Sequence, residues 1–349
     1  MQYTHVFVTH AILQEYLTEG IIRQENIDPA SVLVLRVRGS YKAGEKAAYT
    51  ILNGGDYSNA NGRNLLKHRR TNKQRYLRFK AEVLDQLAPD FQIYSPMYTY
   101  WYLNVLASRA GTYHVLEDGF GSYQSLEELS RYFDRLTPKN WKQRLANLQM
   151  RALMLPGQRE TPGRTIKMLD GVGKCYGTLD GCFPWKAEED RVVVKHTFPP
   201  SHENAFEDAW LMATSCLVEA GLVSLPDYLE ILRETFNHVV DRGIKVLYLK
   251  LHPTQAGHPK HVLAYREVFA EYADRLDLRE LSQDYSIERI AAGNRIKFIT
   301  GISTLGFHVA ATGAEVYRYQ EVIDRIVPGF SDYLPKKGVE FFHRITRSL

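Results

Sequence analysis

Residues 31–38, SVLVLRVR, decide the fold class, because they form a nearly continuous run of apolar and β-branched side chains. Such runs are typical of strands buried on both faces, as in parallel sheets covered by helices. A short β-rich run at residues 6–9 precedes helical spacing at 12–17, and helical spacing returns at 72–87. Strands that alternate with helices predict βαβ units and a parallel α/β sheet.

The same alternation returns in the second half of the chain. Apolar runs predict strands at residues 191–196, 244–251 and 296–300, and helical spacing marks residues 205–219, 226–242, 261–274 and 304–312. Residues 137–190 are rich in Lys, Arg, Gly and Pro and show poor periodicity. We expect two Rossmann-like domains, 1–136 and 191–330, joined by a connector at 137–190, with a tail at 331–349 and a central cleft between the domains.

Composition narrows the class of protein. The 349 residues are 44% hydrophobic and 24% charged, with a formal net charge of +4. These values are ordinary for a soluble globular protein and argue against a polycation built for nucleic acid. The three cysteines lack C-x-x-C spacing, so neither a disulfide framework nor a zinc site is indicated. The first residues lack the basic start and long apolar core of a signal peptide, and we expect a cytoplasmic protein.

An acidic pair follows the strand predicted at residues 112–116. Leu116-Glu117-Asp118-Gly119 stands where a parallel strand would open into a loop, and α/β sheets bind ligands at that end. Two adjacent carboxyls repel, which favours a raised proton affinity in one of them and suits it to take a proton from a hydroxyl. Gly119 permits a sharp turn and close approach of a substrate. The alternative is a solvated acidic turn.

A histidine ends the strand predicted at residues 244–251, in Lys250-Leu251-His252-Pro253. Pro253 fixes the turn after it, and an imidazole there can hydrogen-bond to, or protonate, a leaving phosphate oxygen. Lys250 lies on the same strand face and can meet a base or a phosphate. The alternative is a histidine that only satisfies its own loop.

Two hydroxyls follow the strand predicted at residues 296–300, in Gly301-Ile302-Ser303-Thr304. A helix that begins here offers N–H groups and a positive dipole end to a phosphate. Ser and Thr are equally favoured as plain N-caps, which is the structural alternative. Glu288, in the first turn of an earlier helix, can bind ribose hydroxyls or merely complement the helix dipole.

Two further patterns bear on metals and partners. No Asp-x-Asp pair occurs, which removes the usual sequence sign of a sugar-nucleotide enzyme that holds its diphosphate through a divalent metal. Residues 63–80 carry eight basic side chains and no acidic one. They form a solvated helix face, or they meet an anionic glycan or the anionic inner membrane surface. No nucleic-acid module accompanies them, so nucleic acid is not an expected partner.

Taken together, these strings resemble the bacterial sialyltransferases of GT-B fold, including the polysialyltransferase-like and lipooligosaccharide branches. Those families share an acidic-acidic-Gly motif, a His-Pro motif and a Ser-Ser/Thr motif in this order. Here the motifs are Glu117-Asp118-Gly119, His252-Pro253 and Ser303-Thr304. This chain departs from the pattern in having Glu at the head of the first motif and Thr304 in place of a second serine.

The resemblance implies a metal-independent, inverting transfer of sialic acid from CMP-sialic acid to a hydroxyl of a bacterial surface glycan, without a cofactor. It implies that Asp118 is the general base and that His252, Ser303 and Thr304 hold the donor phosphate. Pro253 would support the donor site, Lys250 would lie near the cytosine, and Glu288 would grip the ribose. The residues predicted for the acceptor side are Glu117, Gly119 and His10, all in the N-terminal domain. The acceptor would be a lipid-linked or anionic glycan, reached from the cytoplasm or at the inner membrane surface.

Other functions stay open at this point. A transferase for another CMP-activated ulosonic acid, such as Kdo or a legionaminic-type sugar, would use the same nucleotide site. A non-catalytic module that binds a glycan or nucleotide would have no need of a base. A basic scaffold acting through residues 63–80 would retain nucleic acid in a strongly salt-dependent way.

Overall fold

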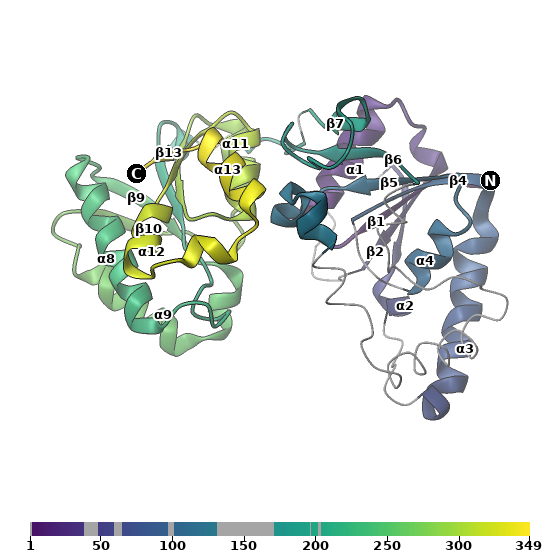
Figure 1. Cartoon of the computed structure of the whole chain (residues 1–349), viewed down its shortest axis with the longest axis horizontal. Helices are drawn as coiled ribbons and strands as arrows, with labels where there is room; N and C mark the ends of the chain where they lie inside the picture. The colour runs from purple at the N-terminus through teal and green to yellow at the C-terminus, as the bar shows by residue number, and fades with distance from the viewer. Residues whose placement is uncertain are drawn as a thin grey trace. The chain divides into compact units, whose positions relative to one another are not determined.

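The structure, a computed structural model, describes residues 2–37, 48–58, 65–96, 101–130, 171–195, 197–201 and 204–349. The chain forms two compact units. Unit 1 contains Met1–Asp118 and Gln124–Thr197, and unit 2 contains Gly119–Tyr123 and Phe198–Leu349. The chain therefore enters unit 2 twice, first with a segment of only five residues. Figure 1 shows the helices and strands of the two units.

Unit 1 is built on a parallel sheet of seven strands in the order β3-β2-β1-β4-β5-β6-β7. Its first strands are nearly continuous apolar runs, and β2 is buried along Val32–Leu35. The strands are β1 (Tyr3–Thr9), β2 (Val32–Arg36), β3 (Thr50–Asn53), β4 (Leu87–Ser95), β5 (Thr112–Leu116), β6 (Val172–Gly177) and β7 (Arg191–Val193). The described part of unit 1 contains the helices α1 (Ile12–Gln24), α2 (Gly55–Ser58), α3 (Leu65–Glu82) and α4 (Trp101–Ala107) and a helical stretch at residues 126–130.

Unit 2 is built on a parallel sheet of six strands in the order β10-β9-β8-β11-β12-β13. The strands are β8 (Trp210–Ala213), β9 (Val246–Lys250), β10 (Asp277–Glu280), β11 (Lys297–Thr300), β12 (Glu315–Arg318) and β13 (Arg347–Ser348). The α-helices are α8 (Leu225–Asp241), α9 (Pro259–Ala270), α10 (Ile287–Gly293), α11 (Thr304–Ala311), α12 (Gln320–Ile326) and α13 (Lys336–Ile345). Helix α8 begins where the Ser224 hydroxyl accepts the Asp227 N–H, and it buries Tyr228, Ile231 and Phe236 in the core.

Both sheets have the strand order of a Rossmann domain. In each, the first strand lies in the middle, the next two extend to one side, and the fourth starts the other side. The order reverses between β1 and β4 in unit 1 and between β8 and β11 in unit 2, and ligands bind at such reversals. The predicted fold class, two Rossmann-like α/β domains as in the GT-B fold, is confirmed. The predicted cleft between them stays a prediction.

The domain limits differ from those predicted. The run at residues 191–196 does begin a strand, but β7 pairs with β6 in unit 1 and does not open the second domain. The predicted connector at 137–190 is therefore corrected from Val172 onward, because β6 belongs to the same sheet. Its earlier part, to residue 170, lies outside the described residues. The predicted tail at 331–349 holds α13 and β13, and β13 pairs with β12.

One predicted element is wrong in kind. Residues 205–219 were expected to form a helix, but they contain β8, the strand between β9 and β11. The apolar run Trp210–Ala213 is too short for its periodicity to separate helix from strand. Among the described helices, none is both long and apolar enough to cross a membrane.

Candidate functional site

The two carboxylates after β5 lie in different environments. Glu117 is fully buried, and its Oε2 accepts hydrogen bonds from the backbone N–H and the hydroxyl of Thr178, each at 2.7 Å. Glu117 thus anchors the loop to the end of β6. The Glu117 side chain points into unit 1 and bonds to Thr178, so repulsion between the Glu117 and Asp118 carboxyls is not its main interaction. The predicted place of Glu117 on the acceptor side stays a prediction.

Asp118 is half-buried and is held by a glutamine from α1. Its Oδ1 accepts from Gln14 Nε2 at 3.3 Å, and the same Nε2 donates to the Glu117 carbonyl at 3.0 Å. The other end of the Gln14 amide accepts the backbone N–H groups of His10 at 3.1 Å and Ala11 at 2.6 Å. Gln14 is only 1% exposed. It therefore ties the end of β1 to the loop after β5 and fixes the Asp118 carboxylate.

His10 follows β1 at the reversal of strand order in unit 1. It is buried, at 3% exposure, and its backbone rather than its ring makes the contact with Gln14. Its predicted role on the acceptor side stays a prediction.

The loop after β9 places His252 at the sheet's carboxyl end in unit 2. Its Nδ1 accepts the Thr254 backbone N–H at 3.2 Å, which in the neutral ring leaves the proton on Nε2. Within the described residues, Nε2 has no hydrogen-bond partner. Burial lowers the pKa of His252, against a smaller opposing effect of Glu219. The ring is therefore a neutral hydrogen-bond donor near pH 7. Pro253 opens the 3-10 turn after it.

A second buried glutamine fixes this loop. Gln255 is fully buried, and its Oε1 accepts the His252 backbone N–H at 2.8 Å and the Thr214 hydroxyl at 2.6 Å. Its Nε2 donates to the Ser215 carbonyl at 3.1 Å. These bonds tie the loops after β8 and β9 together.

Ser303 and Thr304 lie at the start of α11, directly after β11. The Ser303 hydroxyl accepts the Gly306 N–H at 3.2 Å, so its role as an N-cap is real. The Thr304 hydroxyl accepts the Phe120 N–H at 3.2 Å. A hydroxyl that accepts a hydrogen bond still has its own proton to donate. Both residues lie at the reversal of strand order between β8 and β11, beside the positive end of α11.

His252 belongs to the same edge of the sheet. Strands β9 and β11 flank β8, so their carboxyl ends lie about 10 Å apart. That spacing accommodates a ligand between the imidazole and the two hydroxyls.

Lys250 is engaged by the backbone. Its ammonium donates to the carbonyl of Tyr285 and, at 3.4 Å, to that of Gln283. Burial lowers the pKa of Lys250, with the charges of Glu288 and Asp284 acting against it. Lys250 thus fastens the loop before α10, and its predicted place near a cytosine stays a prediction.

Glu288 forms a buried pair with a histidine that sequence reasoning missed. Its Oε1 lies 3.9 Å from Nδ1 of His308 on α11, and its Oε2 accepts the Ser286 hydroxyl at 2.9 Å. Burial would raise the pKa of Glu288, but the hydrogen bond and charge of His308 and the Ser286 hydroxyl hold it below its usual value. The pair joins α10 to α11.

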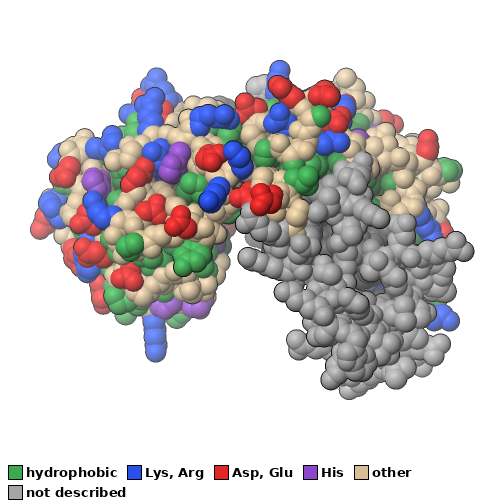
Figure 2. Space-filling view, viewed as in Figure 1, with side chains coloured by type: hydrophobic (Ala, Val, Ile, Leu, Met, Phe, Trp, Pro, Cys, Tyr) green, Lys and Arg blue, Asp and Glu red, His purple; other side chains and the backbone are tan. Residues whose placement is uncertain are grey.

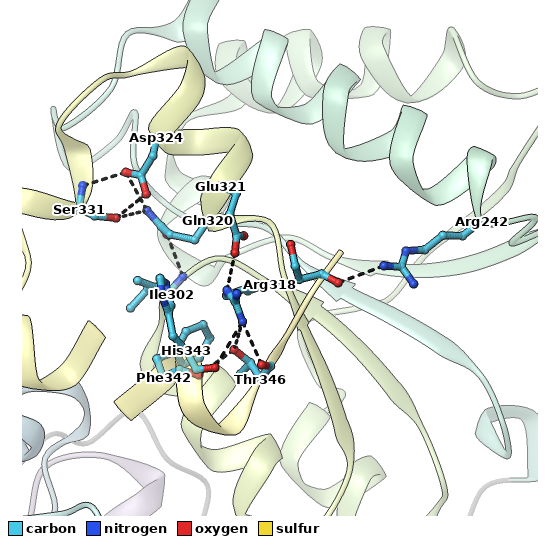
Figure 3. A network of polar contacts seen from close by, with 11 residues as sticks. Arg242, Ile302, Arg318, Gln320, Glu321, Asp324, Ser331, Phe342, His343 and Thr346 are labelled. Carbon is cyan, nitrogen blue, oxygen red and sulfur yellow. Dashed lines mark hydrogen bonds and ion pairs between the residues drawn. The ribbon is translucent and has the colours of Figure 1, made fainter. Parts of the chain in front are cut away.

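A third buried glutamine supports the turn before Ser303. Gln320 Oε1 accepts the Ile302 N–H at 3.3 Å, and its Nε2 donates to Ser331 Oγ at 2.9 Å (Figure 3). Asp324 completes the group by accepting from the N–H and hydroxyl of Ser331. Gln14, Gln255 and Gln320 each follow a parallel strand within a few residues. This is the sequence signal that could have identified them and that sequence reasoning missed.

The basic stretch falls on α3. Lys73, Arg78 and Lys80 are exposed, and the last two form ion pairs with Glu82 and Asp85. On the visible face of unit 2, basic and acidic side chains are interspersed (Figure 2). Among the described residues, no three His, Cys, Asp or Glu side chains come together as a possible metal site.

Known proteins resemble this chain only in structure. No family model matches the sequence, and no curated protein matches it. MnaA of S. aureus in a co-structure with UDP covers 100% of this chain and 91% of its own, at 10% identity and a TM-score of 0.49. UDP-GlcNAc 2-epimerase of Methanocaldococcus jannaschii, with UDP-GlcNAc and UDP, covers 99% of both chains at 10% identity and 0.47. A glycosyltransferase of Rickettsia africae covers 99% and 98% at 11% identity and 0.44. At such low identities and TM-scores, the likeness gives no evidence about chemistry, so the function of this chain has to be inferred from its own residues.

Proposed function

We propose that this chain is a glycosyltransferase that takes its sugar from a nucleotide-activated donor. In the finer form of the proposal, the donor is CMP-sialic acid, the acceptor is a hydroxyl of a bacterial surface glycan, and no metal takes part. The observation that carries the proposal is the place of Ser303 and Thr304. They stand at the strand-order reversal of unit 2, at the start of a helix, with His252 on the same sheet edge.

The leaving phosphate would be stabilised by neutral donors. His252 would donate from Nε2, since Thr254 holds Nδ1 as an acceptor. The Ser303 and Thr304 hydroxyls and the positive end of α11 would supply the rest of the stabilisation. A CMP leaving group needs no proton from His252 in this arrangement, which refines the role expected from the sequence.

Asp118 would act as the general base. As the C2–O bond to the CMP phosphate breaks, its electron pair leaves with the phosphate. The acceptor oxygen attacks C2, and its proton passes to a carboxylate oxygen of Asp118. A single displacement inverts the anomeric centre. Gln14 supports this role because its amide orients the carboxylate without adding a positive charge.

The donor is tested by a thermal-shift panel of CMP, CDP, UMP, UDP and GDP without added metal. A ligand that binds only the folded protein raises Tm by mass action. We expect CMP to raise Tm and the uridine and guanosine nucleotides to have no effect. A selective shift with UDP would overturn the choice of donor, and no shift with any of the five nucleotides would overturn a donor activated by cytidine, uridine or guanosine nucleotides.

The base is tested by Asp118→Asn, assayed with CMP-sialic acid and a glycan acceptor. Removing a general base costs about 10²- to 10⁴-fold in rate, and we expect CMP binding to persist. Wild-type turnover in the variant would show that Asp118 is not the base. Product NMR of the anomeric centre then separates inversion from the retention that a Kdo-type transferase can show.

The proposed function also includes the kind of acceptor and the place in the cell. The exposed basic side chains of α3 suit an anionic or lipid-linked glycan, or the inner membrane surface, with the protein in the cytoplasm. Binding of CMP without transfer or donor hydrolysis would favour the non-catalytic module instead.

A further inference from the structure

Three buried side chains from different elements of unit 2 hold one small residue, Ser215, which comes two positions after β8. The hydroxyl of Tyr228 on α8 accepts the Ser215 backbone N–H at 2.9 Å. Gln255, in the turn after β9, donates to the Ser215 carbonyl at 3.1 Å. Tyr319, directly after β12, brings its hydroxyl oxygen to 3.1 Å from Ser215 Oγ. The backbone and the side chain of Ser215 are therefore both fixed by the fold.

The two tyrosines decide which way the bond between Tyr319 and Ser215 runs. Burial raises the pKa of both phenols, so both keep their protons. Tyr228 is fully buried and already accepts the Ser215 N–H, so its own proton needs an acceptor. Within the described residues, that acceptor is the Tyr319 hydroxyl, to which Tyr228 is hydrogen-bonded. Tyr319 then donates its proton onward to Ser215 Oγ, and the Ser215 proton is left for another acceptor.

This serine lies where a ligand is expected in unit 2. Ser215 follows β8 and Gly301 follows β11, the two neighbouring strands between which the strand order reverses. A Cβ built on Gly301 would lie 3.4 Å from Ser215 Oγ, so the two loops are in contact. Ser215 is half-buried, and within the part of unit 2 that the structure describes its Oγ has no hydrogen-bond partner besides Tyr319. A hydroxyl with an unused proton is therefore held at the reversal.

We propose that Ser215 is a further donor-binding residue, whose hydroxyl donates a hydrogen bond to a phosphate oxygen of the nucleotide-activated sugar. This inference rests on the proposed function and concerns unit 2 alone. Ser303 and Thr304 bind the phosphate from the loop after β11, and Ser215 binds it from the loop after β8. A hydroxyl that offers a proton suits an anionic oxygen, because hydrogen bonds to charged acceptors are the stronger ones. Tyr319 is then a positioning residue that orients the Ser215 hydroxyl.

The direct test is Ser215→Ala, titrated with CMP by calorimetry. Losing a hydrogen bond to a charged group should raise the Kd for CMP about tenfold. The ³¹P resonance of bound CMP should also move relative to wild type. The control is Thr312→Val at the far end of α11, which removes a hydroxyl that donates to the Val309 carbonyl and should change neither quantity. A Ser215→Ala variant with the wild-type Kd, or with the wild-type ³¹P resonance at saturation, would overturn the proposal.

The positioning role of Tyr319 is tested by a double-mutant cycle. Tyr319→Phe should raise the Kd for CMP about threefold in the wild-type background and leave it unchanged in the Ser215→Ala background, because no hydroxyl remains to be oriented. Tyr272→Phe is the matched control, since its hydroxyl bonds to the Arg233 carbonyl and to Asn237. Equal effects of Tyr319→Phe in both backgrounds would overturn this role. If Ser215→Ala does not fold, Ser215→Cys, which keeps the size but donates weakly, replaces it in both tests.

The two levels of proposal fail differently. A wild-type protein whose Tm shifts with none of the five nucleotides overturns the proposed function. If UDP binds in place of CMP, the choice of donor fails, and the same comparison of wild type with Ser215→Ala is made with UDP, because the contact is to phosphate. A wild-type protein that binds a nucleotide no more tightly than Ser215→Ala overturns the role of Ser215 alone.

Discussion

Each unit contains a buried glutamine that fixes the loop after a strand, but the two side chains bond to different groups. Gln14 in unit 1 and Gln255 in unit 2 each lie shortly after a parallel strand and are almost completely buried. Each accepts the backbone N–H of the histidine that follows its strand, His10 for Gln14 and His252 for Gln255. The opposite end of Gln14 reaches the Asp118 carboxylate. The opposite end of Gln255 donates to a backbone carbonyl, that of Ser215, and the Gln255 side chain also bonds to Tyr265.

The two glutamines therefore contribute to their candidate sites in two different ways. In unit 1 the glutamine orients a candidate reactive group directly. In unit 2 it makes the loop rigid, and the reactive ring of His252 is oriented by the Thr254 backbone instead. Changes at Gln255 should therefore affect stability first, and conservative changes at Gln14 should affect catalysis first.

The largest expected effect is that of Gln255→Leu. It removes the acceptor of the Thr214 hydroxyl, the donor to the Ser215 carbonyl and one of the two acceptors of the His252 N–H, which costs about 3 kcal/mol. Tm should fall by about 6–12 °C in calorimetry. Gln86→Leu is the control, because the side chain of this exposed glutamine makes a single hydrogen bond within the described residues, to the Ala81 carbonyl. Equal Tm values for the two variants would contradict the role given to Gln255.

The next effect concerns a histidine of unit 1 that resembles His252. His114 Nδ1 accepts the Lys174 N–H at 3.0 Å, but its Nε2 is already paired with Gln92 at 3.1 Å. Burial lowers the pKa of His114 to about 4, although the Lys174 bond acts in the opposite direction. The unfolded chain therefore takes up a proton first as pH falls from 6.5 to about 4, and stability is lost in that window.

His114→Gln should remove part of that pH dependence, about 2 kcal/mol after allowance for solvent screening. The measurement is the free energy of unfolding in urea at several pH values between 4 and 7. His258→Gln, a change at an exposed histidine, should leave the slope as it is in wild type. A His114→Gln slope equal to that of wild type would show that His114 is protonated normally in the fold.

Gln14→Glu should have a smaller but more specific effect. The carboxylate keeps acceptors for the His10 and Ala11 N–H groups but loses the donor to Asp118 and repels it. We expect kcat to fall about tenfold, or about 1.4 kcal/mol, and Tm to fall as well, because the new carboxylate is buried against the Glu117 carbonyl and the Asp118 carboxylate. Steady-state kinetics and calorimetry on the same preparation check both parts. An unchanged kcat would remove Gln14 from the site.

The smallest effect is expected at the third glutamine. Gln320→Met removes the 3.3 Å bond from the Ile302 N–H and the 2.9 Å bond to Ser331 Oγ, while Asp324 and Ser331 keep their two bonds to each other. Stability should fall by about 1 kcal/mol. A loss as large as that of Gln255→Leu would mean that the turn before Ser303 depends on Gln320 alone.

Much of the fold was predictable because its strands are long apolar runs. The strand predicted at residues 112–116 coincides with β5, and those at 244–251 and 296–300 contain β9 and β11. The motif residues at their carboxyl ends were predicted for the same reason, since the end of a parallel strand is readable from the run before it.

The missed features depend on contacts between distant parts of the chain. Nothing local distinguishes β8 from one turn of a helix, because its identity comes from pairing with β9 and β11. Gln14 and Asp118 are 104 positions apart, and Phe120 and Thr304 are 184 apart. The insertion of Gly119–Tyr123 into unit 2 is equally invisible to periodicity, because only tertiary packing decides it.

The insertion of Gly119–Tyr123 into unit 2 affects any attempt to produce the two units as separate fragments. A fragment starting at Phe198 would contain the whole six-stranded sheet but would lack Tyr123, and the faces of Phe307 and Phe341 that this ring covers would be open to water. The complementary fragment would carry an aromatic loop with nowhere to pack. Adding a synthetic peptide of residues 119–123 to the C-terminal fragment, or splicing it onto that fragment's start, is therefore the rational way to obtain it in soluble form.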